Sequence, residues 1–191
     1  MKKKTVALLL SLVLVFGVVA GGTLAWLTQK TDSVVNTFTY GDINITLDET
    51  TGTNYTIIPG KDLAKDPKIT IKAGSEDCWL FFKYEKTGTF VEDDIIFNLK
   101  LDGWTEGDGT NIPKDVYYRE VPSATTDTVF YLLQGNTTYP NGVIQVKDTL
   151  TKEDIKGLGN PTLTFTAYAC QKDGINDAPT AWAKINPTSG N

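Results

Sequence analysis

The segment CWLFFKYE, residues 78–85, decides the fold class. In an extended chain successive side chains point to opposite faces, so every second residue lies on the same face. The more apolar face of this segment carries Cys78, Leu80, Phe82 and Tyr84. Such alternation, with aromatic side chains in it, predicts a β-strand that covers a hydrophobic core.

Other segments of this kind lie on both sides of it. They are rich in threonine, aromatic and β-branched residues, and Gly, Pro, Asn and Asp separate them. The predicted strands are residues 36–47, 68–72, 78–85, 95–101, 116–121, 128–133, 143–146 and 162–170. About eight strands at this spacing predict an all-β protein, an antiparallel β-sandwich of the jelly-roll type.

One or two short helices are also expected. Thr151 stands three residues before Asp154, a spacing typical of a capping box at the start of a helix. Residues 178–185 form the second candidate, and residues 186–191 make a polar tail. At this length residues 41–185 are expected to form one domain.

The chain begins with a hydrophobic leader in which three lysines precede an uncharged apolar run of 16 residues. Because a helix needs about 20 residues to cross a bilayer, residues 1–25 are predicted to be a secretory signal peptide. Thr23 and Ala25 supply small residues at the positions that a signal peptidase reads, which places cleavage between Ala25 and Trp26. An uncleaved signal anchor is the alternative, because Trp26 and Leu27 prolong the apolar stretch.

The charge of the chain is acidic. It has 18 basic and 23 acidic residues, and removal of residues 1–25 leaves 15 basic and 23 acidic, a net charge of -8. An acidic surface disfavours nucleic acid as a partner, since phosphates require clustered Lys and Arg. The chain contains no histidine, which excludes a His-Glu-x-x-His zinc site and both Ser-His-Asp and Cys-His catalysis.

Cys78 and Cys170 are the only cysteines. They are too few for a disulfide-rich scaffold and lack the paired spacing of a zinc site. Outside the cell they could form one bridge, worth up to about 4–5 kcal/mol through chain entropy. However, Cys78 alternates with the apolar residues of its segment, whereas Cys170 alternates with threonines and Tyr168. A bridge and two separate thiols both stay open.

The alternation changes phase within residues 36–47. Phe38 and Tyr40 are apolar at even positions, whereas the apolar residues that follow stand at odd positions. Because side chains change face at every residue, the slip at Gly41 and Asp42 requires a bulge, a bend, or two strands that serve different surfaces.

The segment GGTLAWLTQKTDSVVNTFTYGDINITL, residues 21–47, resembles the start of the TasA and camelysin family of Gram-positive exported biofilm-matrix proteins. Precursors of that family carry Gly-Gly-Thr-x-Ala and then Thr-Phe-x-x-Gly, matched here by Gly21, Gly22, Thr23, Ala25, Thr37, Phe38 and Gly41. The family's Pro-Gly-x-x-Leu-x-Lys-Asp turn is matched by Pro59, Gly60, Leu63, Lys65 and Asp66. The resemblance hardly extends to residues 90–160.

The resemblance implies a jelly-roll domain, processing by a signal peptidase of the SipW type, and fibres in which the mature N-terminus of one subunit completes the sheet of the next. Such strand addition has a physical basis, because an exposed sheet edge offers unpaired N–H and C=O groups. Residues 26–40 are therefore interpreted as a donor arm with apolar contacts at Trp26, Leu27, Val34, Val35, Phe38 and Tyr40. The alternative is that the arm lies along its own domain as an edge strand.

Acidic and aromatic residues are the remaining candidates for a chemical site. Camelysin has been described as a metalloprotease, but a chain without histidine cannot supply its zinc ligands. The carboxylates of Glu92, Asp93, Asp94, Asp102, Glu106 and Asp108 have no spacing that singles out an acid and a nucleophile. Residues 101–111 have oxygen donors for calcium without the EF-hand pattern.

Several aromatic residues could stack on a sugar, although aromatic residues in strands more often belong to the core. They are Trp79, Trp104, Trp182, Phe81, Tyr117, Tyr118 and Tyr131. Trp104 is expected to be the most exposed of them, because it stands among glycines and acidic residues.

These patterns predict a non-enzymatic protein without a cofactor, secreted to the extracellular matrix or the cell surface. Its main partner is expected to be itself, in a biofilm fibre, with a matrix or minor nucleating protein as a possible second partner. The alternatives are a monomeric cell-surface adhesin or carbohydrate-binding module, and a secreted hydrolase that relies only on carboxylates.

Overall fold

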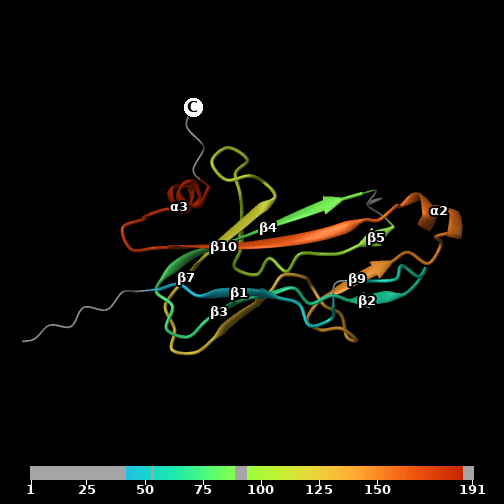
Figure 1. Cartoon of the computed structure of the whole chain (residues 1–191), viewed down its shortest axis with the longest axis horizontal. Helices are drawn as coiled ribbons and strands as arrows, with labels where there is room; N and C mark the ends of the chain where they lie inside the picture. Colours follow the sequence, from blue (N-terminus) through green and yellow to red (C-terminus); the bar gives the residue numbers. More distant parts are fainter. Residues whose placement is uncertain (1–41, 53, 89–93, 187–191) are drawn as a thin grey trace, which may run out of the picture. The chain divides into compact units, whose positions relative to one another are not determined.

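The computed structural model describes residues 42–52, 54–88 and 94–186 of the chain (Figure 1). The strands are β1 (Ile45–Asp48), β2 (Asp62–Ala64), β3 (Lys68–Ile71), β4 (Cys78–Thr87), β5 (Ile95–Ile96), β6 (Thr105–Glu106), β7 (Val116–Val121), β8 (Thr128–Tyr131), β9 (Val143–Val146) and β10 (Thr162–Gln171). The helices are α2 (Lys152–Gly157) and α3 (Ala178–Ile185). Within these ranges no helix is long and apolar enough to span a bilayer.

The strands form three sheets in which every pairing is antiparallel. The strand orders are β1-β3-β8, β10-β4-β7-β6 and β2-β9-β5. The all-β class with two short helices is therefore confirmed. The jelly-roll topology stays a prediction.

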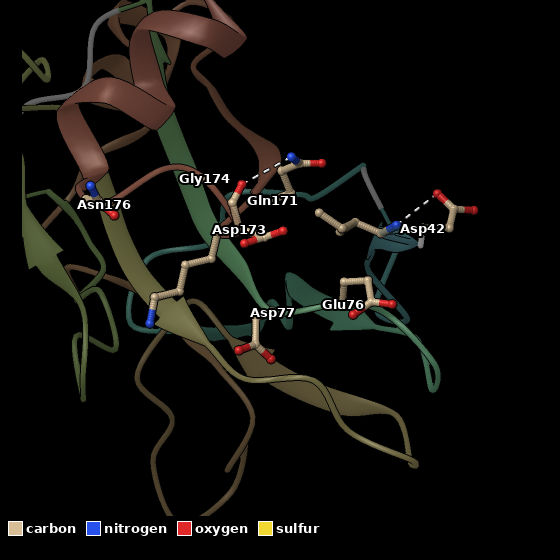
Figure 2. Close-up of a pocket in the computed structure, with 9 residues that line it drawn as sticks. Asp42, Glu76, Asp77, Gln171, Asp173, Gly174 and Asn176 are labelled. Carbon is tan, nitrogen blue, oxygen red and sulfur yellow. Dashed lines mark hydrogen bonds between the residues drawn. The ribbon is translucent and has the colours of Figure 1, made fainter. Parts of the chain in front are cut away.

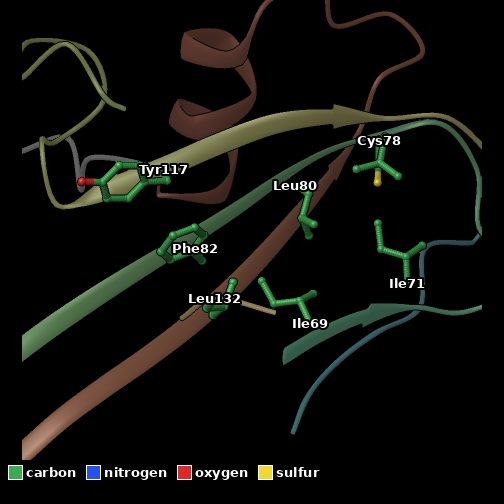
Figure 3. Packing of buried hydrophobic residues seen from close by; sticks show 8 residues of the cluster. Ile69, Ile71, Cys78, Leu80, Phe82, Tyr117 and Leu132 are labelled. Carbon is green, nitrogen blue, oxygen red and sulfur yellow. The ribbon is translucent and has the colours of Figure 1, made fainter. Parts of the chain in front are cut away.

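The main core lies between the sheet of β3 and the sheet of β4 (Figure 3). Alternate residues of β4 face it, as the pattern of residues 78–85 predicted, and Ile69 and Ile71 of β3 oppose them. The aromatic ring of Phe82 is fully buried and stacks on Tyr117, with 5.1 Å between the ring centroids. This cluster consists of Ile69, Ile71, Cys78, Leu80, Phe82, Tyr117, Val121 and Leu132.

Helix α3 covers the opposite face of the β4 sheet. Asp177 caps the helix by accepting a hydrogen bond from the N–H of Thr180 (2.7 Å), and a proline lies in its first turn. Trp182 of α3 packs against Phe81 of β4, with 5.3 Å between their ring centroids. The β4 sheet is thus buried on both faces, which explains why residues 78–82 show almost no polar side chain.

A third cluster forms beneath the sheet of β2, β9 and β5. It contains Ile95, Leu133, Ile144 and Leu158, with Leu163 and Phe165 of β10 packed against it. Helix α2 begins with the predicted capping box, in which Thr151 and Asp154 exchange side-chain to backbone hydrogen bonds. The helix ends beside Leu158, whose side chain is 2% exposed.

The predicted strands differ from the observed ones mainly in length. The strand predicted at residues 36–47 is wrong for residues 42–44, because β1 begins only at Ile45, and residues 36–41 lie outside the described ranges. The strand predicted at residues 95–101 is wrong beyond Ile96, because Leu99 makes only a single bridge, to Leu133, and a turn begins at Leu101. The strand predicted at 128–133 ends at Tyr131. Strands β2 and β6, of three and two residues, were not predicted.

Candidate functional site: the open edge of strand β10

Strand β10 forms one edge of the four-stranded sheet. It pairs with β4 without a bulge over ten residues, from Thr162 opposite Thr87 to Gln171 opposite Cys78. In the described ranges no strand pairs with its other side, although β1 lies close to β10 without belonging to its sheet. The other edge strands found there have only two to four residues. The edge of β10 is therefore the longest open sheet edge in the described part of the chain.

The register shows which backbone groups of β10 point outward. Lys172, one residue beyond the strand, donates its N–H to the carbonyl oxygen of Asp77 at 2.9 Å. In an antiparallel pair, residues that bond to the partner alternate with residues whose N–H and C=O point away. The N–H and C=O groups of even-numbered residues of β10 therefore form the hydrogen bonds to β4. The outward-pointing residues are Leu163, Phe165, Ala167, Ala169 and Gln171.

The composition of β10 does nothing to protect this edge. Exposed edge strands are usually blocked by a charged side chain, a proline, a bulge or a very short length. The sequence of β10, TLTFTAYACQ, has no charged residue and no proline. Its middle residues are only half-buried, although most of them are apolar. The sequence and the register together leave the edge able to accept another strand.

A polar cavity lies at the C-terminal end of β10 (Figure 2). Its lining includes Gln171 and Lys172 from the end of β10 and Asp42 from the start of the described chain. Asp42 is held there because its carbonyl oxygen accepts a hydrogen bond from the N–H of Glu76, at 3.0 Å. The described chain therefore begins beside the C-terminal end of β10.

An apolar cavity of about 570 Å³ lies at the other end of β10. Thr162 and Leu163 of β10 and Ile155 of α2 contribute to it. Its other apolar side chains are Ile57, Leu63, Ile95, Ile144 and Val146. The lining also includes polar residues, among them Asn54, Lys65 and Asn160. The two ends of the open edge thus differ in chemistry, since aliphatic side chains predominate at one and carboxylates at the other.

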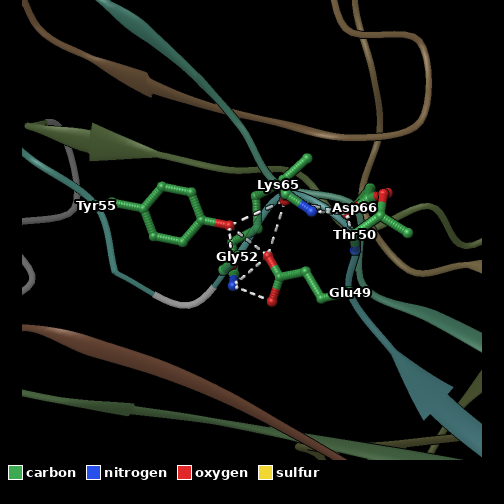
Figure 4. A network of polar contacts seen from close by, with 7 residues as sticks. Glu49, Thr50, Gly52, Tyr55, Lys65 and Asp66 are labelled. Carbon is green, nitrogen blue, oxygen red and sulfur yellow. Dashed lines mark hydrogen bonds and ion pairs between the residues drawn. The ribbon is translucent and has the colours of Figure 1, made fainter.

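A polar network holds the segment that borders the apolar cavity (Figure 4). The Lys65 ammonium lies 2.9 Å from both carboxylate oxygens of Glu49, and these side chains are only 7% and 15% exposed. The Tyr55 hydroxyl lies 2.5 Å from the Glu49 carboxylate. The carboxylate of Asp66 accepts hydrogen bonds from the backbone and side chains of Thr50 and Thr51. These contacts fix residues 49–52 against the chain between β2 and β3.

Two groups of this network have shifted pKa values. Burial, and then the hydrogen bond to Glu49, raises the pKa of Tyr55 to about 12. Burial alone would raise the pKa of Asp66, but the hydrogen bonds from Thr50 and Thr51 together outweigh it and hold the pKa below its usual value. Tyr55 is therefore neutral and Asp66 ionised at neutral pH.

The predicted cleavage site and donor arm lie outside the described residues. This applies to the cleavage positions Ala25 and Trp26 and to the arm contacts Trp26, Leu27, Val34, Val35, Phe38 and Tyr40. The phase slip at Gly41 falls at the boundary, since the description begins at Asp42. These assignments stay predictions.

Cys78 and Cys170 are free thiols. A bridge between them, one of the two alternatives, is wrong because Cys170 lies opposite Trp79 and its neighbour Gln171 lies opposite Cys78. Adjacent positions in paired strands point to opposite faces. Accordingly Cys78 belongs to the main core, whereas Cys170 packs against the cluster under α3.

The aromatic residues are core residues for the most part. Trp104, expected to be the most exposed of them, is half-buried, and its ring meets Phe82 edge-on, with 4.7 Å between the centroids. Phe81, Tyr117 and Trp182 are buried, and the indole N–H of Trp79 donates to the carbonyl oxygen of Ile175 at 3.1 Å. Tyr118 and Tyr131 are half-buried.

The acidic residues are dispersed. Asp108 accepts hydrogen bonds from the backbone N–H groups of Thr110, Asn111 and Ile112, which hold its pKa far below its usual value. Its carboxylate therefore stabilises the turn in which calcium was considered. Asp94 pairs with Lys147 at 3.6 Å. Within the described ranges no three acidic or cysteine side chains come together as a metal site, and Glu92 and Asp93 lie outside them.

No protein-family model, no curated protein and no solved structure matches the chain. The candidate site therefore stands on geometry alone. The sequence pattern predicted the strand at residues 162–170 but not its open edge. The sequence does contain one indication of an unprotected edge, because no charged residue stands between Thr162 and Gln171.

Proposed function

We propose that the chain is an exported structural protein that assembles into extracellular fibres, in which the open edge of β10 accepts residues 26–40 of a neighbouring subunit. The observation that carries the proposal is the edge itself, ten residues long and free of charge, proline and bulge. A native sheet edge of this kind pairs with another chain unless something covers it. Donation of an N-terminal segment uses that tendency in a controlled way.

The energetics require apolar side chains as well as backbone pairing. Five outward-pointing residues offer about ten backbone groups, and a hydrogen bond contributes about 0.5–1.5 kcal/mol net. Ordering ten arm residues costs about 1–2 kcal/mol each, so the ladder by itself does not hold the arm. Burial of a Val, Leu or Phe side chain adds about 1.5–3 kcal/mol. The apolar residues of the arm, among them Val34, Val35 and Phe38, can supply this difference.

Other features of the sequence agree with this function. The leader directs export, the resemblance to the TasA and camelysin family implies a fibre of jelly-roll subunits, and SipW-type cleavage would release the arm. The net charge of -8 after cleavage makes subunits repel one another, so assembly should be favoured by salt and by mild acid. A role as a glycan-binding module has less support, because the aromatic rings of the described residues are largely taken up by the core.

A proline at an outward position of β10 tests the proposal. Ala167→Pro removes one outward N–H and leaves the bonds to β4 in place, since Ala167 does not bond to β4. Ala167→Val at the same position keeps the N–H and serves as the matched control. We expect the proline variant to fold, by circular dichroism and denaturant unfolding, but to form no filaments by electron microscopy. Filaments from folded Ala167→Pro, as abundant as those from Ala167→Val, would exclude β10 as the acceptor.

A further inference from the structure

We propose that the donated arm runs antiparallel to β10, with its Phe38 and Tyr40 end at the apolar cavity beside Thr162. This inference rests on the proposed function and assigns the direction of the inserted strand and the side chains that anchor it. It follows from where the chain enters the domain, how long β10 is, and what lies at each end.

The first step concerns the exit point of a subunit's own arm. The carbonyl oxygen of Asp42 accepts a hydrogen bond from the N–H of Glu76, and that of Asp77 accepts one from the N–H of Lys172. All four residues line the polar cavity at the C-terminal end of β10. Figure 1 shows the start of β1 near the end of β10 that leads to α3, with α2 at the opposite end. The residues before Asp42 are therefore joined to the domain at the C-terminal end of its β10, and this is the exit point of the arm.

The second step concerns symmetry. The donor domain could instead lie at the C-terminal end of the acceptor's β10. The exit points of the two subunits would then lie together and the subunits would exchange arms, which closes a two-fold dimer. An open fibre requires a head-to-tail contact, in which the donor sits at the end away from the acceptor's own exit point. The donor domain then lies at the Thr162 end, and its arm runs from there toward Gln171. Read from N- to C-terminus, that arm is antiparallel to β10.

The third step concerns length and chemistry. At about 3.4 Å per residue, the nine steps of β10 span about 30 Å, and the sixteen steps from Asp42 back to Trp26 span about 54 Å. The arm therefore covers the whole edge, and its last residues before Gly41 lie at the Thr162 end. Phe38 and Tyr40 are two positions apart and project to the same face of a strand.

The apolar cavity suits these two side chains. Its lining of Leu63, Ile144, Ile155 and other aliphatic side chains offers a surface on which aromatic rings lose contact with water. If the arm ran parallel to β10, the rings of Phe38 and Tyr40 would lie at the polar cavity instead. The lining of that cavity includes the carboxylates of Asp42, Glu76, Asp77 and Asp173. Rings placed there would take water away from four carboxylates, for which Lys172 is the only basic residue among the described lining residues. The chemistry of the two ends thus favours the direction that the symmetry requires.

Cross-linking to the native thiol of Cys170 tests the direction. In an antiparallel arm with Tyr40 opposite Thr162, Cys170 lies opposite position 32. In a parallel arm Tyr40 lies instead opposite Gln171, and Cys170 lies opposite position 39. Single cysteines are placed in turn at positions 31–33 and at positions 37–39 of the mature chain. Because Cys78 is the second native thiol and is buried, a second series of the same variants also carries Cys78→Ala. Assembled protein is oxidised and examined on a non-reducing gel, with the chain that has no arm cysteine as the control.

We expect positions 31–33 to give a ladder of covalently linked chains and positions 37–39 to give none. Closed dimers linked only through positions 37–39 would overturn the antiparallel direction and leave strand donation standing. Links within one chain, found as monomers of altered mobility, would overturn strand donation itself. Filaments that show no link at any of the six positions would exclude β10 as the acceptor, and with it this inference.

Discussion

The buried pair of Lys65 and Glu49 provides a quantitative test of the polar network. Glu49→Gln keeps the shape of the side chain and removes its charge, which leaves the Lys65 ammonium, 7% exposed, without a counter-charge. At 2.9 Å and an effective dielectric constant of ~20, the attraction that is lost is about 6 kcal/mol. Part of this is offset because the desolvation of the carboxylate is also removed, and breaking a buried pair typically costs about 3–5 kcal/mol.

Lys65 keeps one favourable contact in the variant, because its ammonium lies 5.1 Å from the centroid of the Tyr55 ring. We therefore expect Glu49→Gln to lower the free energy of unfolding by about 3 kcal/mol, or the melting temperature by about 6–12 °C. Glu85→Gln is the matched control, since Glu85 also pairs with a lysine, Lys83, at 2.7 Å but is 55% exposed. An exposed pair contributes about 0.2–1 kcal/mol.

Urea unfolding followed by circular dichroism measures both variants. The double variant Glu49→Leu with Lys65→Met should be more stable than Glu49→Gln alone, because it leaves no unpaired buried charge. Equal losses of stability for Glu49→Gln and Glu85→Gln would refute the reasoning, since burial would then make no difference to the value of the pair.

Three further outcomes follow from the described contacts. Trp104→Ala should cost about 2–3 kcal/mol in urea unfolding, less than a fully buried Trp because the ring is half-buried; a loss under about 0.5 kcal/mol would mean that Trp104 does not pack on Phe82. The pKa of Asp66 is lowered on folding, so the stability it contributes is present above its unfolded pKa and is lost as the pH falls through the folded pKa. Asp66→Asn should therefore destabilise at pH 7, and progressively less as the pH falls below 3.8, the ordinary pKa of an aspartate. An effect that does not change with pH would contradict this. In native protein a thiol reagent should modify the half-buried Cys170 much faster than Cys78, because Cys78 is fully buried. Burial raises the pKa of both thiols, that of Cys78 to about 11; equal rates for both thiols would contradict the packing.

Local patterns predicted the elements whose stability is local. The alternation in residues 78–85 identified the face of β4 that forms the main core. The bounds of α3 were predicted correctly because the cap at Asp177 and the proline in the first turn are signals within the helix itself. Strands β7 and β9 also matched, because glycine, proline or charged residues border each apolar run.

Features that depend on distant contacts could not be predicted in this way. Glu49 and Lys65 are sixteen residues apart, and neither position shows that its partner is buried with it. Trp104 stands among glycines and acidic residues, so its sequence neighbours suggested exposure, whereas its actual neighbour is Phe82. The open edge of β10 depends on which strands pair with it, and this is a property of the sheet rather than of the strand.

The most direct test of the account is negative-stain electron microscopy of residues 26–191, prepared with Trp26 as the native first residue and without an N-terminal tag. The account predicts regular filaments of uniform width, which become shorter or disappear when residues 26–40 are deleted. Dispersed single particles at neutral pH, in mild acid and at raised salt would contradict the proposed role as a fibre subunit.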